Sequence, residues 1–440
     1  MTEPGSPATF GLPFASWRPY QYEGVERIIH AREADVILVG PPGCGKSGIA
    51  VAAAKALGSP TTILCSTKAL QDQYRDTLGI PLVKGRENFE CPEGHSAAPG
   101  CAPKGGCRPD IRPRCEYAKQ RNAGAAASIV CTNYAYWIRS AKTFTRPVMI
   151  ADECDLVPEH FTSGAALSLS ELDDTDNPLS RLYQWAGDHG RLCRSPCDAF
   201  PTDARVIFDG LYLRPFGQKR IWMSATVLPD YLAAELGLGE PRDYAVIDLP
   251  SFFPPSSRPV IFRSTVRMNN NVGNEELDTL TDAIDNIIAY HLPQKGIIHA
   301  PSHRLCQQII GRSRYRPLMI THGDDTNSPF AKFRNQEVGI LVSPSAGRGM
   351  DFPYDAARWQ IITKLPFPDL ASPIVQARRR TNELWYELIT LNAVLQTAGR
   401  VCRAADDTGA TYILDSNYRW LRGRHKDKLP QYFKQAEIWE

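Results

Sequence analysis

A glycine-rich run near the start of the chain, GPPGCGKS at residues 40–47, has the composition and spacing of a phosphate-binding loop. It follows an apolar segment at 36–39 and precedes a helix-like segment at 48–57. The glycines allow backbone N–H groups to surround phosphate oxygens, and the helix N-terminus adds positive potential. Lys46 would contact the β- and γ-phosphates of ATP, and Ser47 would bind Mg²⁺. The residues that would hold the nucleotide here are Gly40, Gly43, Gly45, Lys46 and Ser47.

Two adjacent carboxylates follow another apolar run, VMIADE at residues 148–153. Open α/β sheets bind ligands at the C-terminal ends of their strands, where these two side chains would lie. Asp152 is suited to the coordination shell of Mg²⁺, and Glu153 is suited to activating the attacking water. A carboxylate pair alone can be a solvated strand end, but together with the phosphate loop it predicts ATP hydrolysis.

Residues 391–404 are predicted to form a helix with two different faces. Apolar side chains recur on one face at helical spacing, and polar ones recur on the opposite face. The polar face carries Gln396, Gly399, Arg400 and Arg403. Two guanidinium groups beside a glycine suit arginine fingers that neutralise charge on a transferring phosphoryl group. The alternative is a solvated basic face. Because this segment is about 350 residues beyond the phosphate loop, arginine fingers here would require two domains to close on each other.

One dense group of thiols marks a candidate metal site, formed by Cys91, Cys101, Cys107 and Cys115. Metal binding fits an enzyme-like intracellular chain better than a disulfide framework does. The gaps of nine, five and seven residues include no Cys-x-x-Cys pair, so they match neither a zinc ribbon nor a ferredoxin run. Spacing alone leaves an iron–sulfur cluster and Zn²⁺ both open, and His95 within the group keeps zinc in consideration.

The remaining cysteines carry weaker signals. Cys65 and Cys131 lie in apolar runs and are predicted to be core residues. Cys193 and Cys197 could provide two metal ligands, but a structural site normally needs four.

Composition sets the broad class of the protein. Hydrophobic residues make up 43% and charged residues 22% of the 440 residues, which is typical of a globular protein with two or three domains. The net charge of +2 gives no global basic field, so nucleic acid would have to bind to local groups. The N-terminal sequence lacks the features of a signal peptide, and no apolar stretch approaches the roughly 18 residues of a membrane span. We expect a cytoplasmic protein without membrane contacts.

Short apolar runs alternate with helical segments, which predicts an α/β fold with parallel sheets. The expected strands of a first series are 36–39, 63–65, 130–131, 148–150 and 222–223, and those of a second series are 260–262, 296–298, 340–342, 361–362 and 412–414. A Pro/Ser-rich stretch separates the series, which predicts domains at 1–255 and 256–440. Residues 84–120 and 156–218 interrupt the first series and are expected to be insertions, the second of them polar and irregular.

The candidate motifs together resemble those of superfamily 2 helicases of the XPD/DinG type. The segments that carry this resemblance are RPYQ at 18–21 (Q motif), STKALQDQ at 66–73 (motif Ia), KGRENFEC at 84–91 (the approach to the iron–sulfur domain), TNY at 132–134 (the turn before motif II), SAT at 224–226 (motif III), 345–351 (motif V) and QTAGRVCR at 396–403 (motif VI). They occur in the family's order from about residue 18 to residue 415.

The resemblance implies two tandem RecA-like domains with a small iron–sulfur insertion in the first. It implies that Arg18 and Gln21 lie at the adenine of ATP, and that Gly349 and Asp351 belong to the nucleotide site. The four dense cysteines would then hold a [4Fe–4S] cluster, with Zn²⁺ as the alternative. The implied activity is an ATP- and Mg²⁺-dependent helicase that moves 5′→3′ on single-stranded or tailed duplex DNA, in the setting of DNA repair. Protein partners stay unknown, and a monomer is the simplest expectation.

Two departures from the family pattern bear on this expectation. The tetrad at 152–155 is DECD, whereas the family usually ends it in His; Asp155 can instead accept a hydrogen bond from Ser224 or Thr226. The family inserts a sizeable Arch domain after this tetrad, but only about 65 residues separate Asp155 from Ile221 here. We therefore expect a reduced Arch-like insertion, which places processive unwinding in more doubt than ATP hydrolysis.

Two rival functions follow from these departures. One is a DNA-stimulated ATPase that remodels nucleoprotein without separating strands. The other is an adaptor with a degenerate ATP site, against which the intact site residues argue. Thr67, Lys68, Tyr134 and Trp137 are candidates for contacts to DNA, although the two aromatic residues could equally belong to the core.

Overall fold

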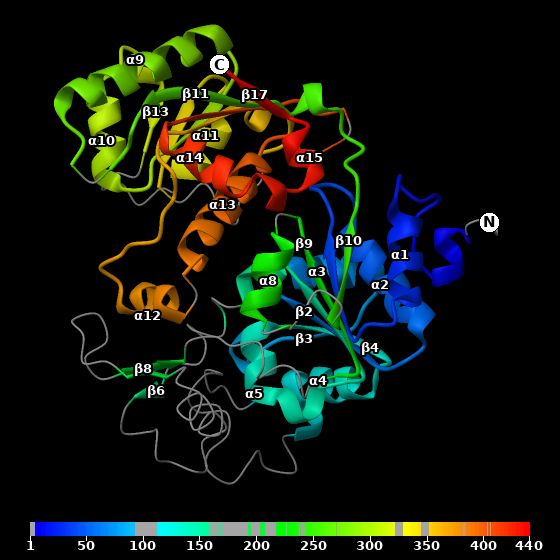
Figure 1. Ribbon diagram of the computed structural model, residues 1–440. Helices are drawn as coiled ribbons and strands as arrows, with labels where there is room; N and C mark the ends of the chain where they lie inside the picture. Colours follow the sequence, from blue (N-terminus) through cyan, green and yellow to red (C-terminus); the bar gives the residue numbers. More distant parts are fainter. Residues whose placement is uncertain are drawn as a thin grey trace. The chain divides into compact units, whose positions relative to one another are not determined.

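The computed structural model (Figure 1) describes most of the 440 residues. The described residues are 5–92, 112–157, 160, 167–168, 192–194, 203–206, 217–225, 227–236, 238, 243–269, 271–321, 329–344, 352–381, 383–402, 404 and 406–440.

The chain forms two compact units. The first contains Met1–Gly40, Cys44–Leu249 and Ala371–Arg378, and the second contains Pro41–Gly43, Pro250–Leu370 and Arg379–Glu440. One change from the first unit to the second falls at Pro250, within the Pro/Ser-rich stretch, and others fall at Pro41 and Arg379. Each unit has its own parallel sheet of seven strands, in agreement with the predicted α/β class.

The sheet of the first unit has the order β10-β1-β9-β5-β2-β4-β3, and all neighbouring strands are parallel. Its strands are β1 (Asp35–Val39), β2 (Thr61–Cys65), β3 (Leu82–Val83), β4 (Ile129–Asn133), β5 (Val148–Asp152), β9 (Lys219–Ser224) and β10 (Tyr244–Asp248). Four of them, β1, β2, β5 and β9, are buried along almost their whole length, which explains the continuous apolar runs in the sequence. Every strand expected in the first series is present.

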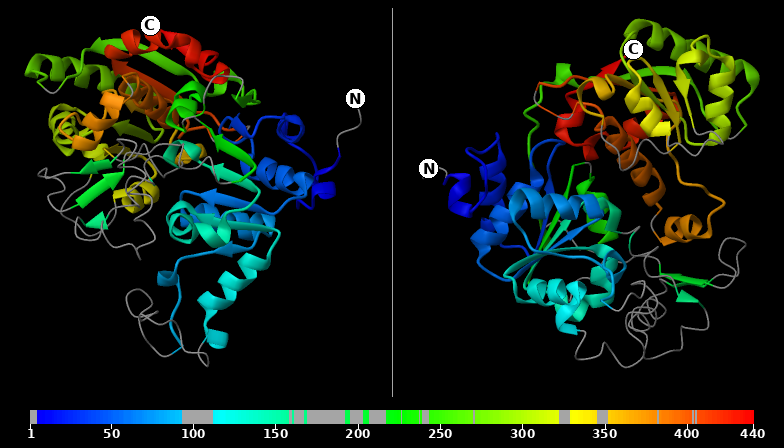
Figure 2. Two further views of the ribbon diagram at one scale, coloured as in Figure 1. Left: turned by 60° about the horizontal axis from the view of Figure 1, so that its bottom comes forward. Right: turned by 180° about the vertical axis from the view of Figure 1, so that it is seen from behind.

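Helices cover both faces of this sheet. The helices on one face are α1 (Gln21–His30), α2 (Lys46–Leu57) and α3 (Lys68–Leu78), and those on the other are α4 (Glu116–Ala126), α5 (Tyr134–Phe144) and α8 (Pro229–Glu235). Alternate side chains of β1 contribute to the two cores: Val36 and Leu38 to one, Ile37 and Val39 to the other. Figure 2 shows the layered arrangement from two further directions.

The region 156–218 contains more regular structure than its polar composition predicts. Strands β6 (Leu167–Ser168), β7 (Leu192–Arg194) and β8 (Asp203–Val206) form an antiparallel sheet in the order β6-β8-β7. The expectation of a wholly irregular insertion was wrong on this point. Short strands of two to four residues give almost no periodic signal, because so few side chains alternate along them.

The sheet of the second unit is also parallel and has the order β13-β14-β12-β15-β16-β11-β17. Its strands are β11 (Val260–Val266), β12 (Gly296–His299), β13 (Met319–Ile320), β14 (Ile340–Ser343), β15 (Trp359–Ile362), β16 (Ala410–Asp415) and β17 (Glu437–Trp439). All five strands expected in the second series are confirmed.

The second sheet also has a core on each face. Helices α9 (Asn274–His291) and α10 (His303–Arg312) pack on one face, and α11 (Pro329–Asn335) packs on the other through Phe333. Helix α13 (Trp385–Ala398) lies next to β15. The remaining helices include α12 (Pro373–Thr381), α14 (Asn417–Arg424) and α15 (Gln431–Lys434).

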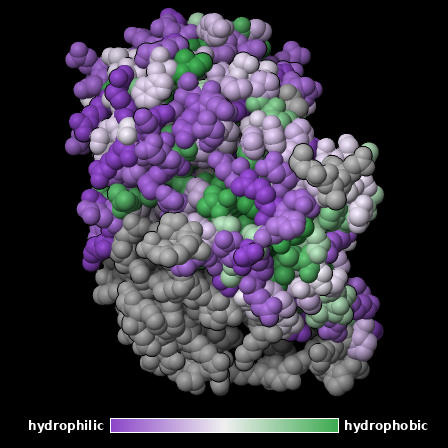
Figure 3. Space-filling view, turned by 45° about the vertical axis from the view of Figure 1, so that its right-hand side comes forward, coloured by the Kyte–Doolittle hydropathy of each residue, from purple (hydrophilic) through white to green (hydrophobic). Residues whose placement is uncertain are grey.

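The surface of the described residues is largely polar on the face drawn in Figure 3, with apolar side chains in limited groups. Within the part of the chain that was described, no helix has the length and apolar character needed to cross a membrane.

Candidate functional site

The order of the first sheet brings the predicted ATPase motifs to one edge. Strand β9 lies between β1 and β5, with Val39 opposite Ser224 and Asp152 opposite Met223. The loop at 40–47 leaves β1 at the same edge where β5 presents Asp152 and β9 presents Ser224. Residues that are far apart in the sequence therefore converge because parallel strands all end on the same side of a sheet.

The loop has the backbone conformation that its glycines predict. Gly43 and Gly45 have φ angles of 78° and 79°, a region that residues with a Cβ rarely adopt. A Cβ at Gly40 would lie 2.8 Å from Cys44 Sγ, so this position has no room for a side chain. Lys46 begins α2, and its Nζ donates to the Gly40 carbonyl oxygen at 3.1 Å. The ammonium group is thereby held over the loop.

The side chain of Gln21 is hydrogen-bonded to the backbone of the loop. Its side chain is buried, and its Nε2 donates to the Cys44 carbonyl oxygen at 2.9 Å. Its Oε1 accepts a hydrogen bond of 2.8 Å from the backbone N–H of Arg18. A Cβ at Gly45 would lie only 2.2 Å from Gln21 Nε2. The structure thus places Arg18 and Gln21 against the phosphate loop.

Asp152 is a buried carboxylate with a donor on each oxygen. The Tyr74 hydroxyl donates to Oδ2 at 2.8 Å, and the backbone N–H of Glu153 donates to Oδ1 at 2.9 Å. The Tyr134 hydroxyl donates to the backbone carbonyl oxygen of Asp152 at 2.7 Å. Three contacts therefore fix both the backbone and the side chain of this residue.

Electrostatics around Asp152 suit a bound cation. Burial raises the pKa of the Asp152 carboxyl, while the charge of Lys46 and hydrogen bonds from Tyr74, Glu153 and Ser47 lower it. A buried acid whose ionised form needs nearby positive charge is a good partner for Mg²⁺. Ser47 and Asp152 supply hydroxyl and carboxylate oxygens, the donor types that Mg²⁺ prefers.

The residues after Asp152 turn sharply. Glu153 has a φ of 53°, and a 3-10 turn at Cys154–Leu156 follows it. The Ser224 hydroxyl donates to Asp155 Oδ1 at 2.5 Å, which confirms the expected contact between these residues. The Ser224 carbonyl oxygen accepts a 3.0 Å hydrogen bond from the Gly40 N–H. Ser224 therefore joins the phosphate loop to the acidic turn; the alternative partner Thr226 lies outside the described residues.

The helix predicted at 391–404 ends earlier than expected. Helix α13 stops at Ala398, and Gly399 follows it as the C-cap. The Arg400 N–H donates to the Thr397 carbonyl oxygen in a tighter turn, and Cys402 has a φ of 62°. Gly399 itself has a φ of −80°, and the chain reverses only at Cys402. Gln396 and Arg400 therefore do not share one continuous helical face; Arg403 lies outside the described residues.

The apolar side of the same segment behaves as predicted. Leu391, Val394, Leu395, Val401 and Cys402 are all buried. Cys402 Sγ lies 3.4 Å from the Asp407 carbonyl oxygen, to which the thiol donates. Packing on both sides of the helix end holds the Arg400 backbone in place.

A series of buried hydrogen bonds in the second unit supports the end of α13. Gln360 Nε2 donates to the Thr397 carbonyl oxygen at 2.7 Å and to Thr411 Oγ1 at 2.8 Å. Its Oε1 lies 2.9 Å from His299 Nε2. Burial, with a smaller contribution from the charge of Arg400, lowers the pKa of His299 to about 4, although the hydrogen bond to Gln360 acts in the opposite direction. His299 is therefore neutral at pH 7.

The two remaining nucleotide candidates, Gly349 and Asp351, lie outside the described residues. The neighbouring Phe352 is described, and its N–H donates to the Arg400 carbonyl oxygen at 3.2 Å. The chain after motif V thus runs beside the segment of motif VI within the second unit.

The cysteine-containing insertion is described only at its two ends. Cys91 is half-buried and Cys115 is buried, and neither is in a disulfide. Cys101 and Cys107 lie outside the described residues, as does His95. Among the residues that were described, no group of three or more His, Cys, Asp or Glu could hold a metal ion.

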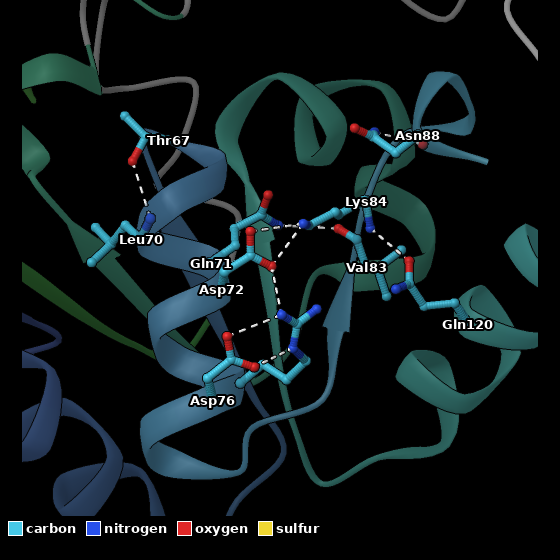
Figure 4. A network of polar contacts seen from close by, with 11 residues as sticks. Thr67, Leu70, Gln71, Asp72, Asp76, Val83, Lys84, Asn88 and Gln120 are labelled. Carbon is cyan, nitrogen blue, oxygen red and sulfur yellow. Dashed lines mark hydrogen bonds and ion pairs between the residues drawn. The ribbon is translucent and has the colours of Figure 1, made fainter. Parts of the chain in front are cut away.

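The two ends of the insertion are held together at its root. The Lys84 N–H donates to Gln120 Oε1 at 2.9 Å (Figure 4), and the ring of Phe89 lies 5.9 Å from that of Tyr117. The guanidinium of Arg86 lies over the Tyr117 ring at 5.5 Å. Cys91 follows Phe89 by two residues and Cys115 precedes Tyr117 by two, so both thiols start from neighbouring points.

Helix α3 is attached to this root, as Figure 4 shows. Lys84 Nζ contacts Asp72 Oδ1 at 2.7 Å, and Gln71 Nε2 donates to the Val83 carbonyl oxygen at 3.2 Å. The Thr67 hydroxyl accepts a hydrogen bond from the Leu70 N–H and so caps the helix. Thr67 and Lys68, the expected DNA contacts, therefore lie at the N-terminus of a helix that is fixed to the insertion.

Several sequence expectations about other residues are settled by burial. Tyr134 and Trp137 are only 1% exposed, so they belong to the core and are not surfaces on which bases stack. Cys65 and Cys131 are fully buried with their sulfurs 3.3 Å apart, as core residues. Sequence reasoning missed Tyr74, whose only signal was its place on the apolar side of α3 between Gln71 and Leu78.

Comparisons with known proteins agree with this architecture. A family model described as "Helicase C-terminal domain" matches residues 287–436. Proteins named "Regulator of telomere elongation helicase 1 homolog" from Drosophila sechellia and Drosophila melanogaster are each 35% identical to this chain, over 24% of this chain and 15% of the relative. The Drosophila persimilis protein of that name is 37% identical over 23% of this chain and 13% of its own length. The match thus spans about one seventh of these relatives.

Solved structures extend the similarity to the whole fold. A structure titled "XPD_Helicase" has a TM-score of 0.67 at 14% identity, with 97% of this chain and 100% of that chain covered. Xpd4 of S. tokodaii has a TM-score of 0.59 at 12% identity, with 96% and 100% covered. The fold is therefore that of two tandem RecA-like domains, and the resemblance to XPD-type helicases is confirmed.

Proposed function

We propose that this chain, which has an XPD-type pair of RecA-like domains and a helicase C-terminal domain, is an ATP-dependent helicase or translocase on single-stranded DNA. The observation that carries the proposal is the convergence of Lys46, Asp152 and Ser224 at one edge of the first sheet. Such a site is built for phosphoryl transfer, which depends on positioning and charge stabilisation more than on covalent chemistry.

Each residue of the candidate site would have its own part in ATP hydrolysis. The loop at 40–47 would surround the phosphates through its N–H groups, and Lys46 would neutralise their charge. Ser47 and Asp152 would hold Mg²⁺, which neutralises charge between the β- and γ-phosphates. Glu153, directly beside Asp152 at the turn, would orient and activate the attacking water.

Arg400 and Arg403 would complete the site from the second RecA-like domain as arginine fingers. Hydrolysis would then depend on closure of the two domains, and alternating closure and opening would move the protein along a strand. The family resemblance supports movement in the 5′→3′ direction. Motif Ia at the start of α3 is our proposed contact to the DNA backbone, through Thr67 and Lys68.

A [4Fe–4S] cluster is the proposed occupant of the four cysteines, with Zn²⁺ as the alternative. The described residues fit this group: the root brings the Cys91 and Cys115 segments together, and both thiols are free of disulfides. Four thiolates are the usual ligand set of such a cluster, which would supply a structural cross-link for the insertion.

Turnover of ATP with and without single-stranded DNA tests the proposal, followed by unwinding of duplexes with 5′ or 3′ tails. We expect ATPase activity that DNA stimulates and that Lys46→Ala abolishes, together with unwinding of the 5′-tailed duplex only. A parental protein that hydrolyses no ATP would refute the proposal and favour an adaptor. The short insertion between Asp155 and Ile221 supports one second candidate, a DNA-stimulated ATPase that remodels nucleoprotein. DNA-stimulated ATP turnover without strand separation would favour that candidate.

A further inference from the structure

Tyr74 lies inside the candidate ATPase site although no motif assigns it a role. Its side chain is fully buried on α3, and its hydroxyl donates to Asp152 Oδ2 at 2.8 Å. The other oxygen of this carboxylate accepts from the Glu153 N–H. Because each carboxylate oxygen has two acceptor positions, Oδ2 can accept from Tyr74 and still bind a cation. Tyr74 therefore fixes the rotation of the carboxylate without occupying the cation position.

Helix α3 also contacts the root of the insertion, through Asp72 on the side away from Tyr74 and through Gln71 on the same buried side. Asp72 pairs with Lys84, whose Nζ lies 2.7 and 3.0 Å from its two oxygens, and Gln71 donates to the Val83 carbonyl oxygen. The Lys84 side chain is only 18% exposed and that of Asp72 is 35% exposed, so this pair is better shielded from solvent than a fully exposed surface pair. Figure 4 shows these contacts side by side along the helix. They are two and three residues before Tyr74.

Helix α3 is short and capped at both ends, so it moves as one body. Thr67 caps its start, and Gly79 closes its end with an N–H that donates to the Arg75 carbonyl oxygen. A shift of the helix at Asp72 must therefore also shift the hydroxyl of Tyr74. Mg²⁺ demands near-ideal octahedral geometry, so a small displacement of one ligand weakens its binding.

We propose that helix α3 links the root of the cysteine-containing insertion to the metal site, and that Tyr74 is the positioning residue that transmits this link to Asp152. The inference deepens the proposed function and rests on it: a motor must adjust hydrolysis to the presence of a strand. The N-terminus of α3 is the proposed contact to the DNA backbone, and α3 connects it, together with the root of the insertion, to the Asp152 carboxylate.

The first test measures binding of a fluorescent ATP analogue while the Mg²⁺ concentration is varied. Tyr74→Phe removes the hydroxyl alone, and we expect the Mg²⁺ concentration at half-saturation to rise about 10- to 100-fold, as when other partners of metal ligands are removed. Affinity for the analogue without Mg²⁺ should not change. The matched control is Tyr418→Phe, because Tyr418 is equally buried and donates to Glu437 Oε1 at 2.8 Å in the second unit.

The second test removes the outer contact of the helix. Lys84→Met leaves the aliphatic part of the side chain but removes its pair with Asp72. We expect a several-fold rise in the Mg²⁺ concentration at half-saturation that disappears when Tyr74→Phe is already present, because non-additivity is the sign of a shared path. Lys119→Met is the control, since Lys119 makes an exposed pair with Glu116 on the neighbouring helix α4.

Three results would overturn the link: no Mg²⁺ shift in folded Tyr74→Phe, no shift in Lys84→Met, or a Lys84→Met shift that persists in full beside Tyr74→Phe. Urea unfolding confirms that each variant is folded, and if Tyr74→Phe does not fold, Lys84→Met decides alone. Failure of the proposed function gives a different result. In that case DNA would not stimulate ATP turnover, but the Mg²⁺-dependent binding of the analogue could still be measured.

Discussion

The buried His299 of the second unit should make the stability of that unit depend on pH. His299 is 9% exposed, and burial lowers its pKa to about 4 from an ordinary value of 6.5. Gln360 uses its amide N–H groups on Thr397 and Thr411, so its oxygen must accept from His299 Nε2. The neutral tautomer with a proton on Nε2 is thus the one that satisfies this chain of hydrogen bonds.

The direction of the effect follows from proton binding in the folded and unfolded states. Between pH 6.5 and 4 the unfolded chain binds a proton at this histidine while the folded unit does not. The stabilising contribution of neutral His299 is therefore complete above about pH 6.5 and is lost as the pH falls toward 4. A shift of about 2.5 pKa units corresponds to about 3 kcal/mol in full, of which about 2 kcal/mol is lost between pH 7 and pH 5.

Hydrogen–deuterium exchange measures this loss locally, which suits a chain of two units. The free energy of opening of β12, β15 and the end of α13 should be about 2 kcal/mol smaller at pH 5 than at pH 7. This value is corrected for the chemical pH dependence of exchange. His299→Gln keeps a side-chain N–H donor but cannot titrate, so most of the difference should vanish. His30→Gln, at an exposed position of the first unit, should leave it unchanged. If parental protein and His299→Gln lose the same opening free energy, the reasoning about His299 is wrong.

The remaining predictions concern the site and the insertion. Lys46→Ala should reduce ATP turnover, measured as phosphate release, to background. The variant should stay folded, because among the described contacts the Lys46 ammonium bonds only to the Gly40 carbonyl oxygen. Arg400→Ala should slow hydrolysis by about 10³-fold or more with a smaller effect on ATP affinity, as for known arginine fingers; normal turnover would refute this role for Arg400. Anaerobically purified protein should be brown and contain about four irons, the stoichiometry of a [4Fe–4S] cluster, and Cys107→Ser should lose the iron and reduce unwinding more than ATPase activity. One zinc without iron would replace the cluster by a zinc site.

The parts of the fold that the sequence predicted are those whose signal is local. Strands such as β1 and β5 are buried on both faces, so they appear as unbroken apolar runs between helical segments. The phosphate loop was recognisable because its glycines are required by local backbone geometry. Strand β10 was missed because its burial alternates irregularly at the edge of the sheet, and β3 has only two residues.

The parts that the sequence could not predict depend on tertiary contacts. The spacing of Gln396, Gly399 and Arg400 is compatible with a helix, but the chain leaves the helix at Gly399. Aromatic residues such as Trp137 could have served either the core or a binding surface, and only packing decides between them. The place of Tyr74 on α3 predicts burial but not its contact with Asp152, because that partner is 78 residues away in the sequence.

Asp155, at the end of the DECD tetrad, makes the expected contact with Ser224 without the histidine that is usual in the family this sequence resembles. Asp155 accepts a short hydrogen bond from Ser224, and the Ser224 carbonyl oxygen in turn accepts from Gly40 in the phosphate loop. The Asp155 carboxylate reaches the serine from the 3-10 turn at Cys154–Leu156. Ser224 connects the acidic turn to the phosphate loop, because its hydroxyl donates to Asp155 while its carbonyl oxygen accepts from Gly40.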